Sequence, residues 1–242
     1  MYSKNETPII RGSLMYYDSQ YSADLGAQVQ EVLEMYGFFP PEKIYADSLT
    51  RGRYIYYRDG MKDLFPNAYS RKGIFGISMA SGDSKKVTDY WKFDWYFTFY
   101  KNKKIISNPE FTPWNVLSLD TTYGRMQDDS LCKQYFSCIR ALISLIRPFY
   151  AKIDDVSNSV ILLDEAKEEC FKPDYVQQIY WGNYWGPDHC ATYGMDNILQ
   201  CPVATVEKIS DGVYFTLTDS VFDATSRRCN KQREKIKRFL GV

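Results

Sequence analysis

The strongest constraint on the fold lies at residues 90–100, YWKFDWYFTFY, where apolar and polar side chains alternate. One face of this segment carries only aromatic side chains, those of Trp91, Phe93, Trp95, Phe97 and Phe99. The other face carries Lys92, Asp94, Tyr96 and Thr98. A period of two indicates a β-strand with one face against a core and the other at least partly in contact with water. We therefore expect a sheet with one strongly apolar face.

A long amphipathic helix is predicted after the sequence QDDS at residues 127–130. Its broad apolar stripe consists of Leu131, Tyr135, Phe136, Ile139, Leu142, Ile143, Ile146 and Phe149. Asp128 and Asp129 are placed to cap the helix and to interact favourably with its dipole. Pro148 is expected to end or kink it. A stripe of this width fits a helix that crosses the aromatic face of the sheet.

The remaining elements alternate irregularly. We expect a helix at residues 23–37, strands at 53–57, 73–80, 114–119 and 159–166, and a hairpin at 203–218 with Asp211 and Gly212 at its turn. A basic helix closes the chain, with a docking edge of Ile236, Phe239 and Leu240. No linker or repeat divides the sequence. The pattern predicts a single α+β domain over residues 1–242, with a mainly antiparallel sheet and helices packed on one face.

The composition of the chain indicates its cellular compartment and limits the metal and cofactor sites it could form. The chain has 30 basic and 30 acidic residues, so no overall field favours nucleic acid or a membrane. No signal peptide or membrane-spanning stretch is visible, which predicts a cytoplasmic protein. The six cysteines form no C-x-x-C pair, and with one histidine they do not match zinc-site spacings. We expect reduced, mostly buried thiols and neither a metal nor a cofactor.

The only histidine, His189, lies in the unusual stretch YWGNYWGPDHCATYG at residues 180–194. Gly186 and Pro187 fit the start of a short helix and Gly194 its end, which makes His189 an ordinary helical residue. We therefore favour a structural role for His189. The alternative is a small hydrolase that uses His189 with a carboxylate partner, since such a partner can be remote in sequence.

The aromatic residues of the same stretch also allow two interpretations. Trp181 and Trp185 are four residues apart and could pack together, with Gly182 and Gly186 allowing a bend or close approach. Asn183 would then hold a turn through backbone hydrogen bonds. Alternatively, the aromatic rings could form a platform for a sugar or a base. The structural interpretation is favoured, because aromatic stripes more often belong to cores.

Charge is unevenly distributed along the neutral chain. Residues 227–242 contain seven Lys/Arg and one Glu, a net charge of +6, which leaves −6 on the remainder. The basic run could contact phosphate through Arg227, Arg228 and Lys231, although no nucleic-acid-binding motif accompanies it. An acidic cluster, DEAKEEC, occupies residues 164–170 and is typical of a solvated surface. Such a surface could instead complement a basic partner.

The stretch at residues 176–194, VQQIYWGNYWGPDHCATYG, followed by NILQCP and DGVYFTL, resembles bacterial immunity proteins of polymorphic-toxin systems, in particular the immunity protein 52 family. The resemblance covers about the C-terminal 150 residues. It implies a small cytoplasmic protein that binds and blocks a cognate protein toxin, with no catalytic residue. It also implies structural roles for the motif residues Trp181, Gly182, Asn183, Tyr184, Trp185, Gly186, His189 and Gly194. We expect the acidic residues Asp164, Glu165, Glu168 and Glu169 to contact the toxin.

Overall fold

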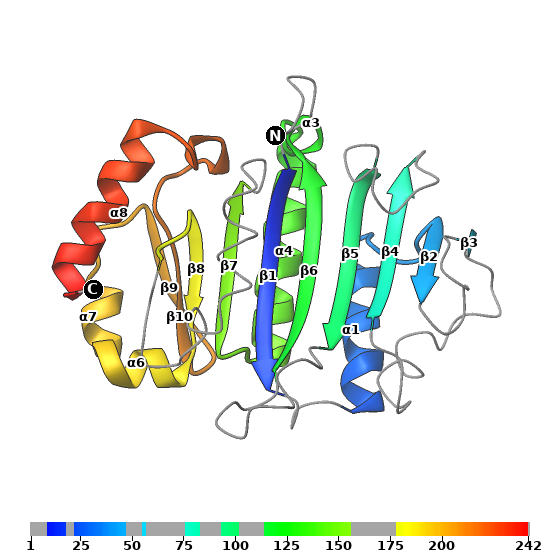
Figure 1. Ribbon diagram of the computed structural model, residues 1–242, viewed down its shortest axis with the longest axis horizontal. Helices are drawn as coiled ribbons and strands as arrows, with labels where there is room; N and C mark the ends of the chain where they lie inside the picture. The colour runs from blue at the N-terminus through cyan, green and yellow to red at the C-terminus, as the bar shows by residue number, and fades with distance from the viewer. Residues whose placement is uncertain are drawn as a thin grey trace.

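A ten-stranded antiparallel sheet forms the centre of the protein in a computed structural model that describes residues 9–17, 22–46, 55–56, 76–82, 93–101, 114–155 and 178–241 (Figure 1). Its order is β3-β2-β4-β5-β6-β1-β7-β8-β10-β9, and every neighbouring pair is antiparallel. The strands are β1 (Ile9–Tyr17), β2 (Lys43–Ala46), β3 (Ile55–Tyr56), β4 (Gly76–Gly82), β5 (Phe93–Lys101), β6 (Trp114–Thr122), β7 (Tyr150–Asp155), β8 (Gly182–Trp185), β9 (Thr205–Ile209) and β10 (Gly212–Thr216). The expected α+β class and antiparallel sheet are confirmed.

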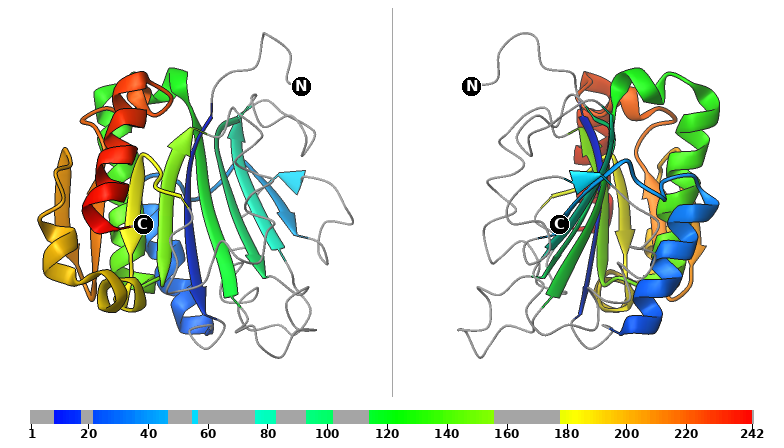
Figure 2. Two further views of the ribbon diagram at one scale, coloured as in Figure 1. Left: turned by 60° about the vertical axis from the view of Figure 1, so that its left-hand side comes forward. Right: turned by 90° about the vertical axis from the view of Figure 1, so that its right-hand side faces the viewer.

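Two long helices lie side by side on one face of the sheet, α1 (Ala23–Met35) and α4 (Asp129–Ile146) (Figure 2). Both were expected from their periodicity. Asp128 caps α4 as predicted, because its side chain accepts hydrogen bonds from the backbone N–H groups of Ser130 and Leu131. The helix ends just before Pro148, at Arg147, whose φ of 49° is left-handed.

The core lies between these helices and the sheet. From β1, the side chains of Ile10, Leu14 and Tyr16 are fully buried, as are Ile139 and Leu142 of α4. Gly12 allows the closest approach, since a Cβ atom there would lie 2.7 Å from Ile139 Cδ1. The face of β1 that carries Gly12 therefore packs directly on α4.

The remaining helices include α3, which directly follows β6, and a group near the C-terminal strands (Figure 1). They are α3 (Tyr123–Met126), α6 (Pro187–Tyr193), α7 (Met195–Leu199), the 3₁₀ helix η6 (Val221–Asp223) and α8 (Arg227–Leu240). Ile153 of β7 pairs with Gly12 and shares its face, so the next residue, Asp154, points to the opposite face. Arg233 of α8 contacts Asp154 there, so α8 packs on the side of the sheet away from α4. Among the described residues, no helix is both long and apolar enough to cross a membrane.

Several predicted elements are confirmed with adjusted bounds, and others were missed. The strands expected at 53–57, 73–80, 90–100 and 114–119 correspond to β3, β4, β5 and β6 where the structure describes them. The strand expected at 159–166 lies outside the described residues. No sequence pattern predicted β1, β2, β7 or β8. Phe239 was expected on the docking edge of α8, but this side chain is 48% exposed, whereas Ile236 is fully buried.

The predicted β9–β10 hairpin forms, with its turn one residue earlier than expected. Gly212 pairs with Ile209, so Ser210 and Asp211 make the turn, and Ser210 has a left-handed φ of 51°. Gly212 is the first residue of β10. A Cβ at Gly212 would lie 2.4 Å from the carbonyl oxygen of Trp185, so this glycine allows close approach of the neighbouring strand.

Candidate functional site

Residues 180–194, hereafter the motif segment, form β8 and α6 at the junction between the central and C-terminal strands. The fully buried Asn183 closes a local loop: its Oδ1 accepts from the backbone N–H of Tyr180 at 3.0 Å, and its Nδ2 donates to the carbonyl of Tyr180 at 2.9 Å. Its amide therefore satisfies the backbone just before β8. Asn183 was expected to form hydrogen bonds with the backbone, and it forms them here at the start of a strand.

Two glycines of the motif segment lie where neighbouring chain segments approach closely. A Cβ on Gly182 would be 3.1 Å from Ile153 Cβ on the adjacent strand. A Cβ on Gly186 would be 2.7 Å from the carbonyl oxygens of both Pro148 and Phe149. The backbone N–H of Gly186 also donates to Phe149 at 3.0 Å. Gly186 thus holds the start of α6 against the start of β7.

His189 and Trp185 belong to a buried aromatic cluster. The His189 ring lies 5.6 Å from the Tyr150 ring and 6.0 Å from the Trp185 ring, centroid to centroid. Trp185 also contacts Tyr193 and Phe215, both at 5.3 Å. Trp185 is fully buried, and His189 is 3% exposed. Because solvent scarcely reaches His189, its surroundings resemble a core rather than a substrate cleft.

The two tryptophans of the motif segment contact different rings, contrary to the pairing expected from their spacing. Trp181 lies 5.4 Å from Phe136 of α4, and its Nε1 donates to Thr218 Oγ1 at 2.8 Å. The spacing of four would bring the rings together on a helix, whereas residues 182–185 form a strand. Two further residues of the segment also have structural roles. The Tyr184 hydroxyl donates to the carbonyl of Ile209 at 3.4 Å, and Gly194 ends α6 with a φ of 81°.

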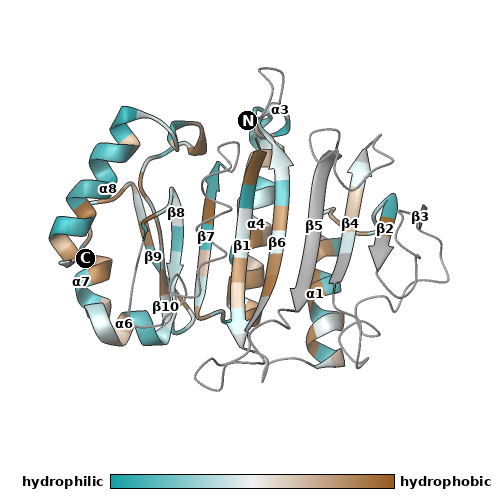
Figure 3. Cartoon of the chain, viewed as in Figure 1, coloured by the Kyte–Doolittle hydropathy of each residue, from teal (hydrophilic) through white to brown (hydrophobic). Residues whose placement is uncertain are grey.

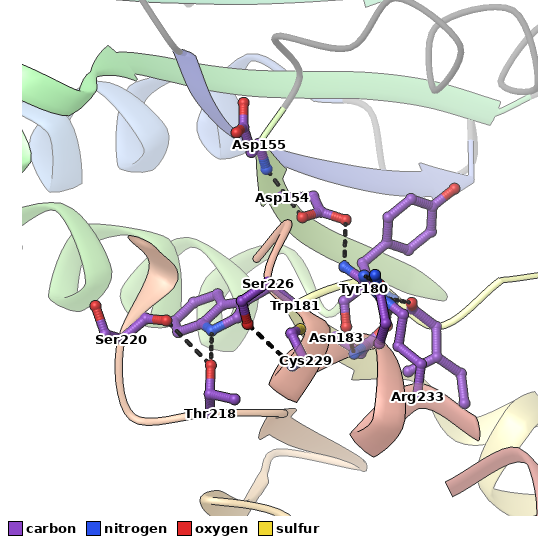
Figure 4. A network of polar contacts seen from close by, with 12 residues as sticks. Asp154, Asp155, Tyr180, Trp181, Asn183, Thr218, Ser220, Ser226, Cys229 and Arg233 are labelled. Atoms are coloured by element: carbon purple, nitrogen blue, oxygen red, sulfur yellow. Dashed lines mark hydrogen bonds and ion pairs between the residues drawn. The ribbon is translucent and has the colours of Figure 1, made fainter. Parts of the chain in front are cut away.

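A buried ion pair joins α8 to the sheet beside the motif segment (Figure 4). Arg233 Nη2 lies 3.3 Å from Asp154 Oδ2, and Arg233 Nε donates to the carbonyl of Ile179 at 2.9 Å. Asp154 is only 4% exposed. Burial raises the pKa of Asp154 to about 6, although the nearby Arg233 guanidinium acts in the opposite direction. The cost of removing this carboxylate from water therefore exceeds the attraction of its partner.

Further charges lie on the same face of the sheet. Arg11 binds Asp120 through two hydrogen bonds, Nε to Oδ1 at 2.9 Å and Nη2 to Oδ2 at 2.7 Å. Lys152, which is 3% exposed, places its Nζ 4.6 Å from the centre of the Tyr180 ring. Bidentate and cation–π contacts of this kind compensate part of the cost of burying charge. The charged residues of β1, β6 and β7 thus take part in packing.

Burial disfavours the thiolate form of the cysteines near the motif segment. Burial raises the pKa of Cys190 to about 11, and Cys190 donates from Sγ to the carbonyl of Trp185 at 3.3 Å. Burial likewise raises the pKa of Cys201 to about 11. Because the thiolate is the nucleophile and the metal ligand, thiols with such values are poorly suited to either role at neutral pH. Within the described ranges, no group of three or more His, Cys, Asp or Glu side chains could hold a metal ion.

Two hollows are lined by described residues, and neither includes His189 in its lining. One, of about 160 Å³, lies between the C-terminal end of α1 and α4, near Phe38, Arg125 and Tyr135. The other, of about 660 Å³, is open and runs along α8. The proposed toxin contacts Asp164, Glu165, Glu168 and Glu169 lie outside the described residues.

The structure brings together residues that the sequence analysis treated separately. No role was predicted for Asp154, and Arg233 was treated only as part of the basic run. Arg233 nevertheless lies on the helix face of the buried Cys229 and Ile236, four residues after one and three before the other. A cation at that position in an apolar stripe is a signal that could have identified the ion pair.

A fold of this kind, an antiparallel sheet with two long helices on one face, has a counterpart among solved structures. The chain is similar to a chain described as Pseudomonas aeruginosa T6SS protein PA0821, with a TM-score of 0.65 and 12% sequence identity. The match covers 95% of this chain and 73% of that one. At this identity the likeness shows a shared fold. No protein-family model matches the chain, and no significant match was found among curated proteins.

Proposed function

We propose that the protein is an immunity protein that binds a cognate bacterial toxin and neutralises it by one-to-one protein–protein inhibition. The observation that carries the proposal is the fold shared with a T6SS protein over 95% of this chain. That likeness is compatible with a secretion-associated role, the role expected from the resemblance of residues 176–194 to immunity proteins.

The environment of the motif segment supports inhibition rather than turnover. His189 is packed between Tyr150 and Trp185, and the Cys190 and Cys201 thiols are held protonated by burial. A stoichiometric inhibitor requires a preorganised scaffold that presents a fixed surface. We propose that the motif segment supplies rigidity of this kind by joining β8, α6 and the start of β7, with its named residues in structural roles.

The proposed setting is the cytoplasm of the producing cell. The five described cysteines are free thiols, and four of them are buried. Unpaired thiols suit a reducing compartment. Fractionation of producing cells should therefore recover the protein with cytoplasmic markers, and recovery with periplasmic markers would contradict this placement.

The test begins with affinity purification from the lysate of the producing cell and identification of the bound proteins by mass spectrometry. The captured toxin is then purified, and its activity is titrated with this protein. We expect activity to fall to zero at one equivalent, together with protection of cells that express the toxin. Full toxin activity in the presence of excess protein would contradict the proposal.

The acidic residues 164–169 are a proposed part of the contact with the toxin. The proposal predicts that reversing the charges of Asp164, Glu165, Glu168 and Glu169 to Lys weakens toxin binding. The matched control reverses Asp188 and Asp196, which are exposed on α6 and α7. Equal affinity of the wild-type protein and the 164–169 variant would remove these residues from the interface.

A further inference from the structure

The outward side of α8 carries four cations in one row. Arg227, Lys231, Lys235 and Arg238 are all exposed and recur at intervals of four, four and three residues, which places them on one side of the helix. We call this row the basic face of α8. At 1.5 Å per residue it extends for about 16 Å. The outer turns of α8 are correspondingly hydrophilic (Figure 3).

The other three cations of α8 form ion pairs with carboxylates of the protein, and the basic face differs from them. Arg233 pairs with the buried Asp154, Arg228 lies near Asp219 and Asp223, and Lys237 lies near Glu234. Within the described part of the chain, no carboxylate forms an ion pair with any residue of the basic face.

The basic face also conflicts with the electrostatics of the helix itself. Arg227 and Arg228 occupy the first turn, where the positive end of the helix dipole favours acidic residues, and this turn contains none. Arg227, Lys231 and Lys235 are successive neighbours at a spacing of four, at which like charges repel. Repelling charges that destabilise a helix and lack a carboxylate partner are typical of a functional surface.

The helix is nevertheless held rigidly. Ser226 caps its N-terminus by accepting from the backbone N–H of Cys229 at 3.1 Å, and Gly241 ends it with a φ of 73°. Gln232 donates to the carbonyl of Pro202, and Ile236 is fully buried. The cations therefore project from a fixed element, which lowers the entropy lost when a partner binds.

We propose that the basic face of α8 is a docking surface for an acidic protein surface, and that this surface belongs to the toxin. The inference rests on the proposed function. An open hollow of about 660 Å³ follows this face, with a described lining of Arg227, Asn230, Lys231, Glu234, Lys235 and Arg238. Phe239, which is 48% exposed, follows directly after Arg238 and provides an aromatic anchor of the kind found at binding hot spots.

Two observations favour a protein partner over nucleic acid. Glu234 lies within the row of cations. Its carboxylate would repel a phosphate backbone but could pair with a Lys or Arg side chain of a protein. The chain is also neutral as a whole, with 30 basic and 30 acidic residues, whereas nucleic-acid-binding domains commonly carry an excess of positive charge. A protein surface that is mainly acidic is therefore a better match than nucleic acid, both for the row of cations that contains Glu234 and for the neutral chain.

The test measures the affinity of purified toxin for the variant Lys231→Gln/Lys235→Gln and for the control Lys133→Gln/Lys208→Gln. All four lysines are exposed, and the two control positions lie on α4 and β9. We expect the α8 variant to bind about tenfold more weakly at low salt, with a difference that shrinks as salt screens the charges. The control should bind within about twofold of the wild-type protein. The melting temperature of the α8 variant should equal or exceed that of the wild-type protein, because repulsion within the helix is removed.

The outcomes separate the two proposals. Failure of the wild-type protein to bind or inhibit the toxin would overturn the proposed function. Tight binding by the wild-type protein with the same affinity and salt dependence in both variants would overturn only the role of α8. A lower melting temperature of the α8 variant, with unchanged affinity, would assign these lysines to folding. Lysine-dependent binding of a short DNA duplex at physiological salt, with toxin binding unaffected, would identify a nucleic-acid surface instead.

Discussion

Arg233 of α8 reaches Asp154 of β7, 79 residues earlier in the chain, and the two side chains are 3.3 Å apart and largely buried. This contact fixes the last helix to the face of the sheet that α4 does not cover. It also leaves the remaining exposed cations of α8 pointing away from the sheet. The packing role and the proposed docking role of the helix therefore depend on different residues of one basic run.

Removing Arg233 should destabilise the protein strongly. In Arg233→Met the Asp154 carboxylate would stay buried without its ion-pair partner, a situation that costs about 3–5 kcal/mol. Urea unfolding at neutral pH measures this loss. The matched control is Arg228→Met, because Arg228 and Asp219 are 69% and 79% exposed and such a pair contributes about 1 kcal/mol or less. Equal losses in the two variants would show that burial of the Arg233 pair has no energetic consequence.

The same pair predicts a distinctive dependence of stability on pH. Burial raises the folded-state pKa of Asp154 to about 6 from 3.8, so the folded protein binds a proton more tightly than the unfolded chain. The contribution of this group to stability is therefore fully present below about pH 4 and is lost as pH rises through about 6, by up to about 3 kcal/mol. The free energies of unfolding of wild-type protein and Asp154→Asn, compared across this range, isolate that contribution. The difference between them should change with pH, and a constant difference would contradict the assignment.

Thr218 should stabilise Trp181 through one buried hydrogen bond. Thr218→Val removes the acceptor 2.8 Å from Trp181 Nε1 and leaves a buried donor unpaired, at a cost of about 1–3 kcal/mol. Thr218 also donates to Ser220 O at 3.0 Å, so the single variant loses two contacts. A double-mutant cycle with Trp181→Phe separates them. We expect a coupling energy of about 1 kcal/mol, and a coupling energy of zero would show that the indole hydrogen bond contributes nothing.

Gly186 should tolerate no side chain. In Gly186→Ala the new Cβ would lie 2.7 Å from two backbone carbonyl oxygens, so β7 or α6 must move, at a cost of about 1–3 kcal/mol. Gly124→Ala is the control, since the nearest atom to its Cβ is Thr122 Oγ1 at 4.0 Å. Thermal unfolding of both variants provides the measurement. A similar melting temperature for the two would mean that the close approach at Gly186 is not required.

The long helices that sequence patterns predicted have one buried and one exposed face. In α4, the buried Ile139, Leu142 and Ile146 recur at helical spacing, while Ser144 and Lys133 are exposed. Such contrast is visible in the sequence because apolar residues occupy the buried side of the helix and polar residues occupy the exposed side. The β9–β10 hairpin was predicted for a different reason, since turn residues separate two runs of strand-forming residues.

The central strands β7 and β8 were missed because every residue of each is buried and, unlike the equally buried β10, neither is joined to another strand by a short turn. Without an exposed face, no alternation can appear. In β7 the problem is compounded by Lys152, Asp154 and Asp155, which are typical of a loop but are buried here with charged or aromatic partners. Those partners lie far away in the chain, so a local pattern cannot reveal them. The motif segment shows the same limit, because its glycines were recognised while the strand that begins at Gly182 was not.

Replacement of His189 distinguishes the inhibitor from the alternative hydrolase. His189 packs its ring between Tyr150 and Trp185 with 3% exposure, so His189→Phe conserves an aromatic ring of similar size in the same space. The six-membered ring is somewhat larger and lacks the polar nitrogens, and overpacking of this kind costs about 1–3 kcal/mol, less than the stability of a typical domain. We therefore expect a folded variant, judged by near-ultraviolet circular dichroism, that binds and inhibits the toxin with wild-type affinity. Loss of inhibition in a folded variant would give His189 a role beyond packing. A hydrolytic activity that disappears in His189→Phe while the fold is retained would favour the enzyme instead.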